Sequence, residues 1–104
     1  IWTMPSSSEG LGLALLEGMS GALPVIASNI PAMKPLVEGA GGIAPPPGDT
    51  NSLAEALHSY LSLDAEALEQ KGEETLRYIA QNHNIEDYRK AYRCLVESTL
   101  AEQL

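Results

Sequence analysis

The stretch from Pro5 to Asn29, PSSSEGLGLALLEGMSGALPVIASN, places the strongest constraint on the fold of this chain. From Gly10 to Met33 the only charged residue is Glu17, and apolar residues surround it. A helix built from this run would be buried on nearly every side. Because an ionised carboxylate is almost never fully buried without a partner, Glu17 either reaches water at the edge of the core or meets a group that needs it.

A turn rich in serine and glycine precedes this helix. Ile1–Met4 is a short apolar run that Pro5 stops, which predicts the end of a buried strand. Ser6–Ser8 are typical turn and cap residues, and Gly10 and Gly12 remove side chains where the helix begins. Helix N-termini offer unpaired N–H groups that suit phosphate, and glycine lets a ligand approach the backbone. The same two glycines equally permit a tight turn without a ligand, so their spacing alone leaves both interpretations open.

Alternating apolar runs and turn residues predict a parallel α/β unit in the first half of the chain. The expected elements are strands at residues 1–4, 24–27 and 42–44 and helices at about 10–20 and 32–37. We expect Gly21 to end the first helix and Pro31 to open the second. The order strand, helix, strand, helix, strand indicates right-handed crossovers between parallel strands. The predicted fold class of this half is therefore α/β, with about three short parallel strands.

The second half predicts helices only. The first of them begins either at a capping box formed by Ser52 and Glu55 or at Asp49. Asp64 is expected to cap the next helix and Asn84 the last one. We expect one partial domain over residues 1–104, with an α/β half at 1–48 and a helical segment at 49–104.

Composition excludes several kinds of protein. At 104 residues and 44% hydrophobic content, the chain is one small globular domain at most. Its net charge of −8, with no Lys or Arg before Lys34, argues against nucleic acid and anionic membranes as partners. A single cysteine, Cys94, excludes an internal disulfide and fits a reducing compartment, and we recognise no signal peptide, so we expect a cytoplasmic protein. Since no His, Cys and carboxylate set has metal-ligand spacing, we expect no metal site.

The stretch from Pro5 to Asn29 resembles the donor-site motif of a known family. Retaining, nucleotide-sugar-dependent glycosyltransferases of the GT-B fold, in the group 1 family that includes glycogen synthases and sucrose synthases, share a Pro-Ser-x-x-Glu-Gly-aromatic-Gly-Leu segment. A second Glu follows after seven intervening residues, then Ala-Met, a Gly and Pro-Val-Val-Ala-Ser. The matching residues here are Glu9, Gly10, Gly12, Leu13, Glu17, Met19, Gly21, Pro24, Val25, Ala27 and Ser28. Leu11 and Gly18 depart from the pattern, because an aromatic residue and alanine are usual at these two positions.

The resemblance implies a role for each residue of the motif. Glu9 would be the catalytic residue, facing the donor sugar and accepting hydrogen bonds from its hydroxyls. The donor sugar and diphosphate would contact Gly10, Leu11, Gly12 and Leu13. Glu17 would accept hydrogen bonds from the ribose hydroxyls of the nucleotide. The nucleotide sugar is a substrate, and neither a metal nor another cofactor is implied.

The resemblance also implies that the chain is the later part of the second of two Rossmann-like domains. The N-terminal acceptor domain, and the Arg and Lys that hold the donor diphosphate in the family, would then lie upstream. We therefore expect the 104-residue chain alone to be inactive, and any membrane contact to be made by the missing regions. In the family the final helix crosses back to the other domain, so Tyr88 and Tyr92 are expected to serve that surface.

Two other interpretations stay open at this point. The chain is compatible with a nucleotide-binding Rossmann-like module of another chemistry. It is also compatible with a non-catalytic fragment that binds a partner and keeps only the fold. An upstream acceptor domain that carries the Arg and Lys pair would favour the glycosyltransferase over both.

Overall fold

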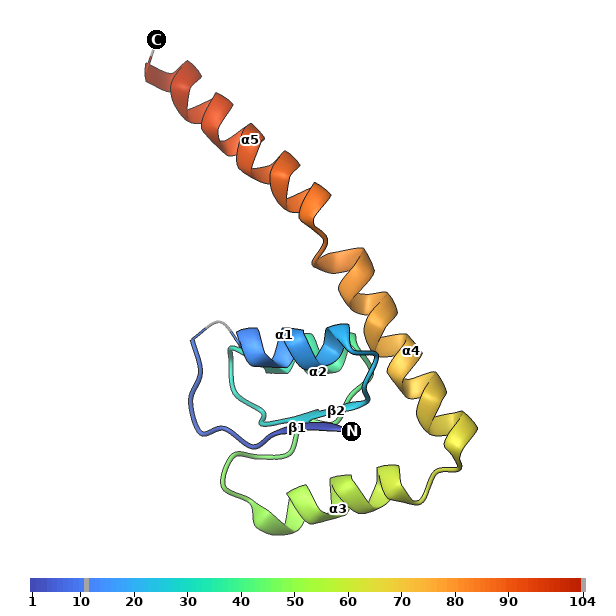
Figure 1. Cartoon of the computed structure of the whole chain (residues 1–104). Helices are drawn as coiled ribbons and strands as arrows, with labels where there is room; N and C mark the ends of the chain where they lie inside the picture. The colour runs from blue at the N-terminus through green and yellow to red at the C-terminus, as the bar shows by residue number, and fades with distance from the viewer. Residues whose placement is uncertain (11, 104) are drawn as a thin grey trace.

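The computed structural model describes residues 1–10 and 12–103. The elements in chain order are β1 (Trp2–Met4), α1 (Leu13–Ser20), β2 (Val25–Ala27), α2 (Lys34–Gly39), α3 (Thr50–Leu61), α4 (Ala65–Asn82) and α5 (Ile85–Gln103). Figure 1 shows α1 and α2 on one side of the two strands and α3 on the other, with α4 running alongside and α5 extending away from the rest. The chain is therefore a mixed α/β unit followed by helices, as the sequence predicts.

The sheet is parallel, as predicted, but shorter than expected. β1 pairs with β2 in the register Trp2 to Val25. The third predicted strand is reduced to one parallel bridge, between Ile26 and Ile43. The surrounding sequence explains the difference, because a glycine turn precedes Ile43 and prolines follow from Pro45 onward. Proline has no N–H to donate, so the ladder is interrupted at Pro45, although the Pro45 carbonyl still accepts a hydrogen bond of 2.9 Å from the N–H of Asn29.

Two clusters of apolar side chains hold the layers together. The larger cluster lies between the sheet and helices α1 and α2. Its buried members are Leu15, Met19, Val25, Ala27, Ile30, Met33, Leu36, Val37 and Ala40. The smaller lies between the sheet and α3 and contains Ile26, Ala56 and Tyr60. The Tyr60 hydroxyl donates a hydrogen bond of 3.2 Å to the Val25 carbonyl oxygen. Burial raises the pKa of Tyr60, followed by a smaller effect of Glu74, so the phenol stays a neutral donor that ties α3 to the sheet.

The prediction that the first helix is buried on nearly every side is wrong. The helix begins at Leu13 rather than at residue 10 or 11, because Gly12 has a left-handed backbone (φ 65°) that a right-handed helix does not contain. Its buried residues are Leu15, Gly18 and Met19, and Leu13 and Glu17 are exposed. The helix covers one face of the sheet from outside, so its other side meets water.

Two further predictions are corrected in detail. The second helix begins at Lys34, after a turn at 31–33, and Pro35 rather than Pro31 occupies its first turn. Ile1–Met4 is half-buried rather than fully buried, because β1 is the edge strand of the described sheet and has a strand neighbour on one side only.

The predicted caps of the later helices are correct. Asp49 caps α3, the second of the two alternatives that the sequence offered, and Asp64 caps α4. Asn84 accepts a hydrogen bond from the backbone N–H of Asp87 at the start of α5. Every residue of α5 is exposed, and no helix in the described part of the chain has the length and apolar character needed to cross a membrane.

Candidate functional site

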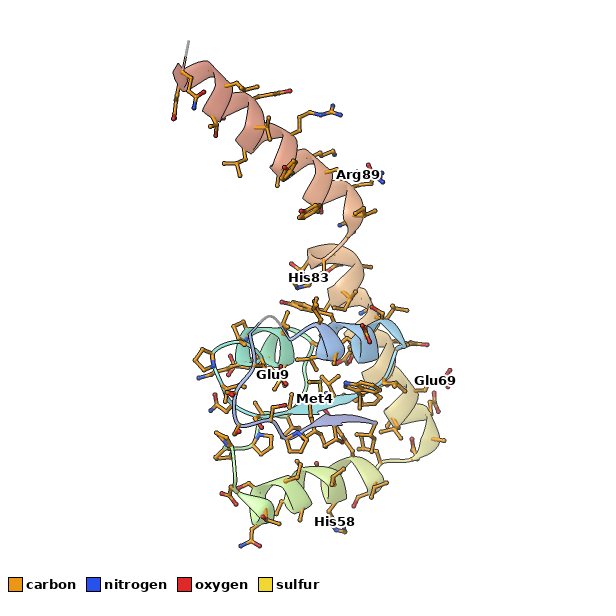
Figure 2. All side chains as sticks on the ribbon, turned by 60° about the vertical axis from the view of Figure 1, so that its left-hand side comes forward. Met4, Glu9, His58, Glu69, His83 and Arg89 are labelled. Atoms are coloured by element: carbon orange, nitrogen blue, oxygen red, sulfur yellow. The ribbon has the colours of Figure 1, made fainter. Side chains whose placement is uncertain are left out.

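The loop between β1 and α1 carries most of the residues that the motif predicts to bind the donor. It leaves the carboxyl end of β1 at Pro5 and reaches α1 at Gly12. Figure 2 shows Met4 in the sheet and Glu9 beside the helices that cover it. In an open parallel α/β sheet, ligands bind at this carboxyl edge. The topology therefore places the motif where a ligand is expected.

Glu9 and Gly10 are both accessible on this loop. The Glu9 carboxylate accepts a hydrogen bond of 2.9 Å from the Ser6 hydroxyl, which orients it without burying it. A Cβ placed on Gly10 would meet no atom within 4 Å. Gly10 is therefore not needed for packing in the described structure, and close approach of a ligand remains a sufficient reason for a glycine there.

Gly12 has a different role. Its positive φ turns the chain into α1, and its carbonyl accepts the first helical hydrogen bond, from the N–H of Leu16 at 3.1 Å. No described side chain caps the helix, so its first N–H groups remain free to bind an anion. Leu13, the first helical residue, is 63% exposed. Leu11, also predicted to contact the donor, lies outside the described residues.

Glu17 lies on the outer side of α1, one helical turn beyond its first residue. Its side chain is exposed and forms no ion pair with any described residue. This resolves the question raised by the sequence: the carboxylate reaches water and does not need a partner in the core. It is free to accept hydrogen bonds from a ligand.

Gly18, one of the two departures from the motif, has a packing explanation. A Cβ at this position would overlap the indole ring of Trp2. The larger alanine usual in the family is therefore incompatible with this placement of Trp2. The departure concerns the contact between α1 and β1 and leaves the exposed side of the helix unchanged.

The loop from Pro5 to Gly12 has no Lys or Arg in its sequence. The six Lys and Arg residues of the chain all lie at or after Lys34, and three of them, Arg89, Lys90 and Arg93, are on α5. Among the described residues, no group of three or more His, Cys, Asp or Glu side chains is placed to hold a metal ion. Backbone N–H groups and the helix dipole are thus what the loop itself offers to an anion.

Sequence reasoning missed a second feature of the same sheet edge. A hollow of about 220 Å³ lies between the strand ends and the start of α3; its lining residues are Pro5, Ser28, Pro45, Pro46, Gly48, Asp49, Thr50 and Leu53. The signal was present, because Pro5, Ser28 and Pro45 each follow a predicted strand and the carboxyl ends of parallel strands share one edge. The turn residues alone did not show that the three ends enclose a space.

Comparison with known proteins identifies the family. The model of the family described as "Glycosyl transferases group 1" matches residues 1–63. The chain is similar to a sulfoquinovosyl transferase of Arabidopsis thaliana, with 37% identity over 86 residues that cover 75% of this chain and 17% of the relative. It is also similar to a lipopolysaccharide core biosynthesis mannosyltransferase of Rhizobium leguminosarum, with 31% identity over 103 residues, covering 98% of this chain and 29% of the relative.

A solved structure also resembles the chain. Sucrose-phosphate synthase from Thermosynechococcus elongatus superposes with a TM-score of 0.86 at 28% identity, covering 96% of this chain and 25% of that protein. The chain spans less than a third of the length of the curated relatives described above. The match of the family model over more than half of the chain, together with this likeness to a GT-B enzyme, shows that the chain belongs to the group 1 glycosyl transferases.

Proposed function

We propose that the chain is the donor-binding part of a retaining glycosyltransferase that takes a sugar from a nucleoside-diphosphate sugar. The observation that carries the proposal is the uncapped N-terminus of α1, which follows directly on the loop that holds Glu9. Membership of the group 1 family supports it. The part of the reaction assigned to this chain is to bind the donor and to stabilise the leaving diphosphate.

The diphosphate lies over the turn from Gly10 to Leu13 in this proposal. The open surface at Gly10 lets phosphate oxygens approach the backbone, and the N-terminal N–H groups of α1 donate to them. As the bond to the sugar breaks, negative charge develops on the leaving phosphate, and fixed N–H donors stabilise it without rearranging. The Arg and Lys that complete the diphosphate site, and the acceptor domain, belong to other parts of the enzyme, and no metal or other cofactor is proposed.

The two glutamates have separate roles in this proposal. Glu9, held by Ser6, accepts hydrogen bonds from the hydroxyls of the donor sugar and positions its anomeric carbon. Glu17 accepts from the vicinal hydroxyls of the ribose. When ionised, both carboxylates can only accept hydrogen bonds, which is what hydroxyl donors require.

Single substitutions in the full-length transferase test the proposal. Glu17→Ala should raise the donor KM by roughly ten-fold or more, since a hydrogen bond to a charged group contributes about 1.5–3 kcal/mol. Glu9→Ala should lower kcat more than it raises the donor KM, because the reacting carbon is misplaced. The matched control is Glu55→Ala, which removes an exposed glutamate of α3.

Melting temperatures complete this test. Because Glu9 and Glu17 are exposed, neither substitution should lower the melting temperature by more than the control does. An unchanged donor KM in a stable Glu17→Ala protein would contradict the ribose assignment. Sugar transfer by the 104-residue chain alone would contradict the proposal that the acceptor domain and the diphosphate cations lie elsewhere.

The exposed apolar residues of α5 belong to the same proposal. Ile85, Tyr88, Tyr92, Leu95, Val96 and Leu100 are each at least 40% exposed. Tyr88 and Tyr92 stack on each other with ring centroids 6.2 Å apart. We propose that this face packs against the acceptor domain, and that the enzyme works in the cytoplasm.

A further inference from the structure

The hollow at the start of α3 has a polar wall that the proposed donor site does not use. Ser28 is 2% exposed, lines the hollow, and its hydroxyl forms no hydrogen bond with any described residue. Its neighbours are the strand ends and the start of α3, so the space beside it is the hollow itself. The hydroxyl is not among the fully buried atoms that lack a partner, so it opens on the hollow, where a ligand can form a hydrogen bond with it.

Asp49 provides the second polar group of this wall. One of its carboxylate oxygens accepts from the N–H of Ser52 at 3.0 Å, and the other accepts from the Ser52 hydroxyl at 2.8 Å. These bonds lower the pKa of Asp49, the backbone bond most, so the group is ionised at neutral pH. Each oxygen keeps a second lone pair, so Asp49 can still accept a hydrogen bond from a ligand.

The chemistry of the wall selects against phosphate. The carboxylate of Asp49 occupies the helix N-terminus that would otherwise attract an anion, and no Lys or Arg is among the described residues that line the hollow. Acceptors and hydroxyls are present instead, with Thr50 beside Asp49. The C–H surfaces of Pro5, Pro45 and Leu53 form the remainder of the lining. Hydroxyl partners beside apolar C–H surfaces match a sugar ring.

We propose that this hollow is a subsite for a pyranose ring, whose hydroxyls bond to Ser28 and Asp49 and whose C–H face lies on the prolines. The proposal rests on the proposed function, because it takes the ring to belong to one of the two sugars of the transfer reaction. A volume of about 220 Å³ is below the usual 300–1,000 Å³ of a whole ligand pocket, so one ring rather than a whole substrate is expected there. Pro5 joins the hollow to the loop of Glu9, which places the ring next to the donor site.

A titration followed by NMR tests the subsite directly in the full chain. Methyl α-D-glucopyranoside and methyl α-D-mannopyranoside are the sugar probes, and UDP is the nucleotide probe. The sugars should shift the backbone amide signals of Ser28 and of residues 48–53, whereas UDP should shift those of Gly10, Gly12 and Leu13. Sugar shifts that are absent, or confined to the loop before α1, would overturn the subsite. A UDP response at the loop in that same experiment would leave the proposed function standing.

Variants of the polar wall sharpen the result. Ser28→Ala should weaken sugar binding about three- to ten-fold, and Asp49→Asn, which keeps a capping oxygen, by at least about three-fold. The matched control is Asp64→Asn, because Asp64 caps α4 in the same way and lies outside the hollow. Unchanged binding by both wall variants, with spectra as well dispersed as those of the wild type, would also overturn the proposal.

The source of the ring is decided by kinetics of the full-length transferase. If it belongs to the acceptor, Ser28→Ala raises the KM for the acceptor and leaves the KM for the donor unchanged. If the ring belongs to the donor, Ser28→Ala raises the KM for the donor and leaves the KM for the acceptor unchanged. Both KM values equal to those of wild type would contradict the subsite, while transfer itself would still support the proposed function.

Discussion

Two helices begin at the same edge of the sheet, and their first turns differ in the group that caps them. The N-cap of α1 is Gly12, a backbone turn without a side-chain cap, whereas the N-cap of α3 is Asp49, whose carboxylate accepts from the N–H of Ser52. The N-terminus of α1 thus keeps its free donors and partial positive charge, and that of α3 is neutralised by the protein.

One edge of a sheet can therefore offer binding places to two kinds of ligand. An uncapped helix beside glycine suits an anion such as a diphosphate. A capped helix beside a buried hydroxyl, as at Ser28, suits neutral hydroxyl groups. Each of the next predictions changes one of the two helix starts and leaves the other intact.

The largest effect is expected from adding a negative charge to the loop before α1. Gly10→Asp should lower donor affinity by roughly ten- to hundred-fold, because a carboxylate would face the diphosphate and like charges at an interface repel strongly. Gly10→Asn is the matched control, since it adds a side chain of similar size without the charge. Both fit the open space at Gly10, so the melting temperature should not change.

Donor KM values of the two variants decide this prediction. Equal losses of donor affinity in Gly10→Asp and Gly10→Asn would indicate that the size of the added side chain, and not its charge, excludes the ligand. No loss in either variant would place the diphosphate away from this loop and remove the contrast between the two helix starts.

A smaller effect, on stability alone, is expected from the backbone turn of α1. Gly12→Ala should lower the free energy of unfolding by about 1–2 kcal/mol, because its positive φ is strained for any residue with a Cβ. Space is not the cause, since the nearest atoms to that Cβ would be 3.8 Å away. The control, Gly10→Ala, has neither strain nor contact and should be close to neutral. Urea unfolding measures both, and equal effects would show that Gly12 is not the conformational start of the helix.

Much of the fold was predictable, because local sequence determines it. Asp49, Asp64 and Asn84 were identifiable as caps from residue type and position, and Gly21 as the end of α1. The parallel order of the strands followed from the helices between them. These features depend on a few neighbouring residues, which the sequence displays directly.

The features that were predicted wrongly or missed depend on which surfaces meet in three dimensions. The apolar run around Glu17 predicts a helix buried on nearly every side, because it does not reveal that α1 covers only one face of a sheet and leaves Leu13 exposed. The strand at Ile43 is reduced to a bridge because Pro45 has no N–H to donate to the ladder, although its carbonyl still accepts from the N–H of Asn29 on the neighbouring segment. The hollow at Ser28 joins three segments that are 17 or more residues apart, so no local pattern contains it.

The smallest effect is expected from titrating the cap of α3. The pKa of Asp49 in the folded chain is lowered, so the ionised carboxylate stabilises the fold above the pKa of the unfolded chain, near 3.8. This stabilisation is lost as the pH falls through the folded pKa. The difference in melting temperature between wild type and Asp49→Asn should therefore be constant from about pH 5 to pH 7 and shrink below about pH 4. α1 has no titratable cap, so Gly12→Ala should show a difference that does not depend on pH. Melting curves of the three proteins across this range test the comparison: a difference for Asp49→Asn that stays constant to pH 2 would show that the charge of Asp49 does not stabilise the start of α3, and would leave only its geometry to distinguish the two helices.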